Sequence, residues 1–133
     1  MKWSVFTLSI ILLQCTVDNI QKFNYVINNS SNENLKLQKI KNKNVIEEMY
    51  LNQNEKITFT FSSKTETLNL SNVFKTDTIY LVLSNGKKIN YGNCLSNGCS
   101  NNSRNIFNFN QYSLENKLTY TYLINNLDML LAK

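Results

Sequence analysis

The sequence predicts an all-β protein, an antiparallel β-sandwich of seven or eight short strands, with a small β-barrel as the alternative architecture. The chain has 133 residues, 42% hydrophobic and 17% charged, which suits one folded domain. It contains 24 Asn, one Ala and no Pro, a composition that disfavours long helices and supplies turns. Apolar and polar residues alternate with a period of two in several short stretches, the pattern of strands with one buried face.

The first half of the chain carries three of these stretches. Residues 23–27 form a first strand with Phe23, Tyr25 and Ile27 on one face, and residues 35–37 begin a second strand in which leucines alternate with lysines. The turn-forming residues between the two strands predict a hairpin. Residues 45–51 are assigned to a third strand, although their pattern also fits a short helix.

The middle of the chain contains the clearest strand patterns. Residues 56–62 place Ile57, Phe59 and Phe61 on one face and hydroxyl side chains on the other. A weaker alternation around Leu68 and Leu70 ends in an expected turn. Residues 78–83 are apolar on both faces, which predicts a central strand covered on both sides.

The second half begins with a hairpin. Asn85-Gly86 separates the central strand from residues 87–91 and predicts a type I′ turn, because both residues tolerate positive φ. A long loop follows over residues 92–104, and then Ile106 or Phe107 is available for the core. Residues 117–124 repeat the strand pattern.

The last nine residues predict a helical turn capped by Asn126. This turn is expected to place Leu127, Leu130 and Leu131 against the edge of the domain. The complete pattern favours an immunoglobulin-like or similar sandwich.

The N-terminus has the layout of a secretory signal peptide. Lys2 supplies one positive charge, and residues 5–13 form an apolar run interrupted by only two hydroxyl side chains. This run is shorter than the roughly 20 apolar residues that a membrane-spanning helix needs. We expect a signal peptide over residues 1–14, a lipidated N-terminus and tether over residues 15–22, and a β-sandwich domain over residues 23–133.

The end of this segment resembles the lipobox of bacterial lipoproteins, which is a leucine, two small residues and a cysteine. Leu12 and Cys15 match the pattern, while Leu13 and Gln14 are larger than the usual residues. The resemblance implies cleavage before Cys15, which then carries a diacylglyceryl group and an amide-linked fatty acid such as palmitate, with the lipid bilayer as its partner. In some lipoproteins an Asp after the cysteine retains the protein on the inner membrane. Because Thr16 stands at this position, the resemblance implies the outer membrane, on its periplasmic or surface face. The alternative is an ordinary signal peptide that is cut elsewhere.

Four residues separate Cys94 from Cys99 in a stretch rich in turn-forming residues. An exported chain reaches an oxidising compartment, so we expect a Cys94–Cys99 disulfide that fixes one loop. A redox-active pair is the alternative, but the spacing differs from C-x-x-C. Three Cys without any His do not make an ordinary zinc site, so no metal is expected.

The densest basic stretch holds Lys36, Lys39, Lys41 and Lys43, in a chain whose formal net charge is +5. Such lysines can contact phosphates or anionic lipid head groups, but neither a stacking pattern nor a recognition helix accompanies them. We therefore favour a solvated strand edge, where lysines oppose aggregation, and we expect no nucleic-acid partner.

Arg104 is the only arginine in the chain. Its guanidinium group suits a clamp for the carboxylate or phosphate of a ligand. We favour the other interpretation, a structural tie between its loop and a backbone carbonyl or an acidic side chain such as Asp77 or Asp128.

Eight aromatic residues are candidates for a ligand groove, although residues at strand spacing more often form core and cross-strand pairs. They are Phe59, Phe61, Tyr80, Tyr91, Phe107, Phe109, Tyr120 and Tyr122. The chain contains no His, and its nine acidic residues show no paired-carboxylate motif, so we expect neither an enzyme nor a cofactor.

The C-terminal half resembles small lipoproteins of AT-rich Gram-negative bacteria. These carry an apolar strand, a short turn, a lysine-bearing strand, an Arg-Asn pair, a tyrosine and an aromatic strand before a terminal helix. The matching residues are Ile79 to Leu83, Asn85-Gly86, Lys87, Lys88, Arg104 to Ile106, Tyr112, Tyr120 to Ile124, Asp128 and Ala132. The resemblance covers less than half of the chain and implies a fold and a location, without an activity.

Two functions remain in consideration. The first is a lipoprotein anchored through Cys15, whose β-sandwich serves as a binding or envelope-structural module with a protein or glycan partner. The second is a secreted, soluble β-sandwich with an adhesive or inhibitory function. The chemical state of the mature N-terminus distinguishes them.

Overall fold

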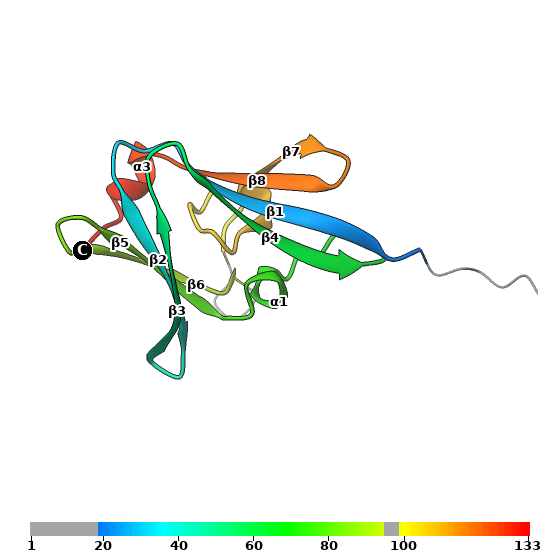
Figure 1. Ribbon diagram of the computed structural model, residues 1–133, viewed down its shortest axis with the longest axis horizontal. Helices are drawn as coiled ribbons and strands as arrows, with labels where there is room; N and C mark the ends of the chain where they lie inside the picture. The colour runs from blue at the N-terminus through cyan, green and yellow to red at the C-terminus, as the bar shows by residue number, and fades with distance from the viewer. Residues whose placement is uncertain (1–18, 95–98) are drawn as a thin grey trace, which may run out of the picture.

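A computed structural model describes residues 19–94 and 99–133, and it shows a β-sandwich built from two four-stranded sheets (Figure 1). The strand order is β4-β1-β8-β7 in the first sheet and β3-β2-β5-β6 in the second. The predicted fold class is therefore confirmed, and the described strands do not close into a barrel. The predicted signal peptide and Cys15 lie outside the described residues.

The described elements are short and follow one another closely along the chain. In order they are β1 (Gln21–Asn29), β2 (Leu35–Lys41), β3 (Asn44–Leu51), β4 (Lys56–Ser63), α1 (Leu70–Phe74), β5 (Thr78–Leu83), β6 (Lys88–Gly92), the 3-10 turn η1 (Phe109–Gln111), β7 (Tyr112–Asn116), β8 (Thr119–Ile124) and α3 (Asn126–Met129). The sequence pattern missed β7, a short edge strand with mostly exposed side chains.

The strand pairing differs from the prediction in two respects. β1 pairs with β4 and not with β2, so the expected first hairpin is wrong. β1 also pairs in parallel with β8, which makes the first sheet mixed. The buried Asn29 explains the crossing between sheets, because its side-chain amide donates to the backbone carbonyls of Glu33 (2.7 Å) and Leu51 (3.0 Å). These bonds direct the chain after β1 into the second sheet.

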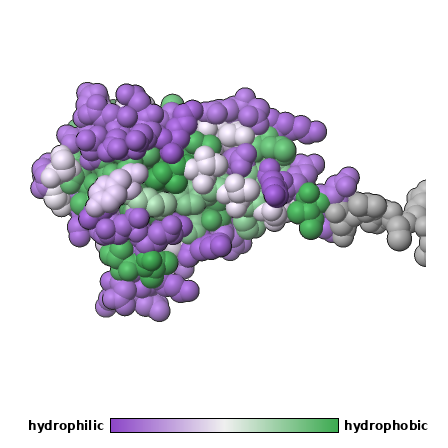
Figure 2. Space-filling model, in the orientation of Figure 1, coloured by the Kyte–Doolittle hydropathy of each residue, from purple (hydrophilic) through white to green (hydrophobic). Residues whose placement is uncertain are grey.

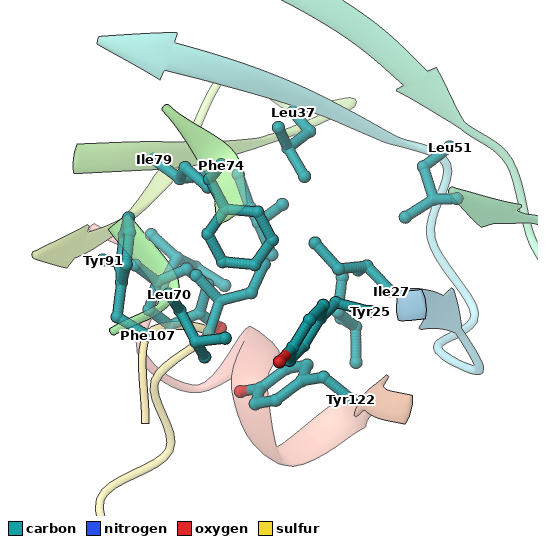
Figure 3. Close-up of a cluster of buried hydrophobic side chains, with 14 of the residues drawn as sticks. Tyr25, Ile27, Leu37, Leu51, Leu70, Phe74, Ile79, Tyr91, Phe107 and Tyr122 are labelled. Atoms are coloured by element: carbon teal, nitrogen blue, oxygen red, sulfur yellow. The ribbon is translucent and has the colours of Figure 1, made fainter. Parts of the chain in front are cut away.

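The core lies between the two sheets. Figure 3 shows Tyr25 and Tyr122 from the first sheet on one side of this space and Leu37 and Ile79 from the second sheet on the other. All four side chains are completely buried. Their positions follow the period-two patterns of β1, β2, β5 and β8, so each sheet presents one apolar face to the other.

The short helix α1 closes one side of the core. Leu70, Val73 and Phe74 are buried, and the Phe74 ring lies 4.9 Å from that of Phe59 and 5.4 Å from that of Phe107. The expected strand and turn in this segment are therefore wrong. The buried residues recur three and four positions apart, which is the spacing of a helix face.

The two hairpin turns of the second sheet differ in backbone geometry. In the β5–β6 turn only Gly86 of the Asn85-Gly86 pair has a positive φ (83°), and the Gly86 amide donates to the Leu83 carbonyl. This is a three-residue turn with a glycine bulge, and the predicted type I′ turn is wrong here. The two-residue β2–β3 turn does have the type I′ signature, with φ of 52° at Asn42 and 65° at Lys43.

The C-terminal turn is helical but faces the other way from the prediction. Asn125, not Asn126, caps α3, and its side chain accepts a hydrogen bond from the Leu127 amide (2.9 Å). The one completely buried residue of α3 is Asp128. Because Asp128 is held inside the protein, the three leucines are turned to solvent: Leu127, Leu130 and Leu131.

Candidate binding surface

Arg104 is a structural tie to Asp128, as the sequence analysis favours. Its Nε donates to Oδ1 of Asp128 at 3.2 Å, and its Nη2 donates to Oδ2 of Asp128 and to the Leu123 carbonyl (2.6 Å). The hydroxyls of Tyr91 (3.1 Å) and Tyr122 (2.9 Å) also donate to Oδ1 of Asp128. Burial raises the pKa of both tyrosines well above the ordinary value, and the negative charge of Asp128 raises it further. We call Arg104, Asp128, Tyr91 and Tyr122 the Asp128 cluster. Both carboxylate oxygens of Asp128 accept hydrogen bonds from within the protein.

Cys94 and Cys99 form the expected disulfide, with a Cα–Cα distance of 4.9 Å. The side chain of Asn105 lies beside this loop, since its amide donates to the Gly92 carbonyl (2.9 Å) and contacts the Cys99 sulfur (3.6 Å). The bond therefore joins the end of β6 to the segment that carries Arg104 toward the Asp128 cluster.

The prediction of a solvated edge for the lysine stretch is wrong for β2. This strand lies between β3 and β5, and Lys39 is only 7% exposed. The Lys39 Nζ lies 2.7 Å from a carboxylate oxygen of Glu47 and 4.9 Å from the centroid of the Phe59 ring. The Lys39 ammonium group is thus paired within the protein and is not offered to a ligand. Lys41 and Lys43, at the far end of the hairpin, remain exposed.

Most of the candidate aromatic residues belong to the core. Seven of the eight are buried or packed against the buried cluster, as their strand spacing favours. Tyr80 differs, because it is half-buried on the outer face of the second sheet, opposite Gln38 of β2 and Asn90 of β6. The expectation that both faces of β5 are covered is therefore wrong.

The outer face of the second sheet is the candidate binding surface. Its side chains form two rows across the four strands: Tyr50, Lys36, Val82 and Lys88 in one, and Glu48, Gln38, Tyr80 and Asn90 in the other. Tyr50 is 73% exposed, and Lys88 and Asn90 are also open to solvent. Sequence reasoning missed Tyr50, although its position in β3 places it outward once Leu51 is assigned to the core.

Polar groups on this surface are held in place by their neighbours. The Gln38 amide donates to a carboxylate oxygen of Glu48 at 2.6 Å, and the Lys36 Nζ lies 3.5 Å from the same carboxylate oxygen. The Lys88 Nζ lies 5.7 Å from the centroid of the Tyr80 ring. The surface thus combines one exposed and one half-buried aromatic ring with amide and cationic side chains at fixed strand spacing.

A cleft lies at each end of this surface. The larger one, about 770 Å³, is formed by the β2–β3 turn, the end of α1, the start of β5, and the side chains of Tyr80 and Asn90. The smaller one, about 410 Å³, is bordered by Tyr50, Lys36 and Val82. The β2–β3 hairpin projects from the body of the molecule, with apolar surface beside a hydrophilic tip (Figures 1 and 2). Val45 and Ile46 contribute exposed apolar side chains there, 47% and 50% accessible.

Searches found no family model, curated protein or solved structure that matches this chain. Among residues 19–94 and 99–133, no three Cys, Asp or Glu side chains gather as a metal site requires. None of the helices in this part of the chain is long and apolar enough to cross a membrane.

Proposed function

We propose that this chain is a β-sandwich binding module that recognises a ligand with the outer face of its second sheet. The observation that carries the proposal is the solvent-open surface in which Tyr50 and Tyr80 lie among amide and cationic side chains. More particularly, we propose a bacterial outer-membrane lipoprotein that is anchored through acylated Cys15 and binds a glycan of the cell envelope.

The place of the first strand is compatible with such an anchor. β1 begins at Gln21, with five residues between it and Cys15. The six steps from Cys15 to Gln21 span at most about 22 Å when fully extended. β1 begins at one end of the molecule, whereas α3 and the C-terminus lie at the other end (Figure 1). An anchor at Cys15 would therefore hold one end of the sandwich near the bilayer and leave the opposite end free.

The chemistry of the outer face favours a glycan. The apolar C–H face of a sugar ring packs on an aromatic ring, while amide groups satisfy its hydroxyls. Tyr50 and Tyr80 supply the rings, and Asn90 supplies a solvent-exposed amide in the same sheet. Lys36 and Lys88 add positive charge, which suits the acidic groups of envelope glycans.

We predict that the full-length chain in detergent co-sediments with purified peptidoglycan sacculi. The Tyr50→Ala variant should bind about tenfold less, because loss of a packing contact made by an exposed aromatic ring costs on the order of 1.4 kcal/mol. Leu114→Ala is the matched control, since Leu114 is an exposed apolar residue of the other sheet, 59% accessible. Absence of wild-type co-sedimentation, or equal binding of wild type and Tyr50→Ala, would contradict the proposed binding face.

A further inference from the structure

The larger cleft is positively charged. Lys41, Lys43 and Lys75 line it together with Asp77, the only acidic residue among its lining residues. All four side chains are exposed, and Asp77 accepts a hydrogen bond from the Asn93 amide (3.4 Å). Within the described part of the chain, none of the three lysines forms an ion pair. The cleft therefore has an excess of unneutralised cations around a space large enough for a small ligand.

Two of these lysines occupy backbone positions that favour other residues. Lys43 has a φ of 65° in the β2–β3 turn, and Lys75 has a φ of 58° and a ψ of 31° at the C-terminal cap of α1. Left-handed backbone is strained for a residue with a Cβ atom, and Gly or Asn usually occupies such turns and caps. Both strained lysines lie at the same cleft. Local stability does not explain why lysines occupy these two positions, whereas a need for two ammonium groups at the cleft does.

The two walls of the cleft are tied to each other. The buried hydroxyl of Thr76 donates to the backbone carbonyl of Ile40, which immediately precedes Lys41. This bond fixes the segment after α1 against the end of β2, so Lys75 and Lys41 project from neighbouring parts of a rigid frame.

We propose that this cleft binds a phosphoryl group carried by a saccharide. Lysine ammonium groups bind phosphate as point charges, and three of them surround the cleft. Tyr80 and Asn90 form the part of its wall that continues into the outer face of the second sheet, where a sugar ring would extend. The inference rests on the proposed glycan-binding role of that face and adds the ligand class at one of its ends.

Calorimetric titration of the full-length chain in detergent tests this inference. Glucose 6-phosphate is expected to bind at least tenfold more tightly than glucose, with affinity that falls as salt is raised. Lys43→Gly and Lys75→Gly should each weaken binding about tenfold while Tm stays the same or rises, because glycine relieves the left-handed backbone. Lys117→Asn, in the β7–β8 turn of the other sheet, is the control that leaves binding unchanged.

Weaker binding without a fall in Tm distinguishes a ligand-binding role of the two lysines from a structural role. Equal affinities for glucose and glucose 6-phosphate, or unchanged binding by both lysine variants, would overturn the inference. A fall in Tm in both variants would also overturn it, since it would show that the lysines are retained for packing. If sacculi still co-sediment in a Tyr50-dependent manner, the proposed function stands without the phosphate site.

The source of the phosphoryl group is resolved by two further probes. Vesicles that contain phosphatidylglycerol present a phosphorylated polyol as a lipid head group, and inorganic phosphate presents the anion alone. Binding of glucose 6-phosphate and not of these vesicles identifies a soluble or polymeric glycan, and lysine-dependent binding of the vesicles identifies a head group. If inorganic phosphate competes as strongly as glucose 6-phosphate, the saccharide part of the inference is wrong.

Discussion

Replacing Asp128 with Ala is expected to lower the free energy of unfolding by about 3 to 5 kcal/mol. Asp128 is completely buried and accepts hydrogen bonds from Arg104, Tyr91 and Tyr122, and from the Asn125 backbone amide (2.9 Å). Removal of its carboxylate leaves two tyrosine hydroxyls without their acceptor and the Arg104 guanidinium without its counter-charge. It also removes side-chain contacts that tie α3 to β6 and β8, so the C-terminal segment should be the first part to open.

Urea unfolding of the Asp128→Ala variant measures this effect. Glu115→Ala is the control, because Glu115 is an exposed acidic residue on β7 and its loss should change stability by less than about 0.5 kcal/mol. The Arg104→Met and Asp128→Asn double variant should recover part of the loss, since it removes both charges of the pair. A loss below about 1 kcal/mol in Asp128→Ala would mean that the Asp128 cluster does not hold the sheets and α3 together.

Raising the pH above about 10 is expected to unfold the protein steeply. Burial raises the pKa of Tyr91, Tyr122 and Tyr112 above the value of about 10 that tyrosine has in an unfolded chain. The folded state therefore retains protons that the unfolded state releases. The stability linked to these groups is fully present below pH 10 and is lost as the pH rises, by about 1.4 kcal/mol per pH unit for each tyrosine.

Two signals followed together test the alkaline transition. Tyrosinate absorbance from the buried rings should rise only as the circular dichroism of the sheets is lost. Tyr91→Phe should make stability less dependent on pH in this range, because it removes one of the buried hydroxyls that keep their protons in the folded state. Ionisation of all tyrosines near pH 10 with the sheets intact would contradict the burial of the Asp128 cluster hydroxyls.

The period-two pattern predicted most strands because burial of one face is a local property. Ile57, Phe59 and Phe61 on β4, and Ile89 and Tyr91 on β6, pack in or against the core as expected. Strand pairing was harder to predict, because it depends on residues far apart in the chain. The crossing after β1 is set by the buried amide of Asn29, and an Asn in a turn-rich segment carries no sequence signal that distinguishes this use from an ordinary turn.

The errors at α1 and α3 have a common physical origin. Both helices are too short for propensity to decide their structure, so tertiary contacts decide which side faces inward. In α1 the apolar side chains face inward, and Phe74 packs in the core. In α3 the buried group is Asp128, because four residues donate hydrogen bonds to its carboxylate, and the leucines remain exposed to water. The expected structural tie of Arg104 is confirmed, and the structure selects Asp128 over Asp77, the other acidic partner that the sequence suggested.

The candidate binding surface was foreseen only in part. Tyr80 and Lys43 were candidates because of their residue types, but a single sequence does not show that both lie at one cleft with Lys75. That neighbourhood is created by the β2–β5 pairing and by the Thr76 bond to Ile40. Left-handed lysines are likewise visible only in the backbone geometry.

We propose above all that a lipid on Cys15 holds the sandwich at a membrane. The intact mass of the protein purified from its native membrane tests this claim most directly, because one spectrum reports the cleavage site, the acyl groups and the state of Cys94 and Cys99. We predict a chain that begins at Cys15, carries a diacylglyceryl group and an amide-linked fatty acid, and contains the Cys94–Cys99 disulfide. A water-soluble product with a free N-terminus beyond Cys15 would contradict the membrane anchor and favour the secreted alternative.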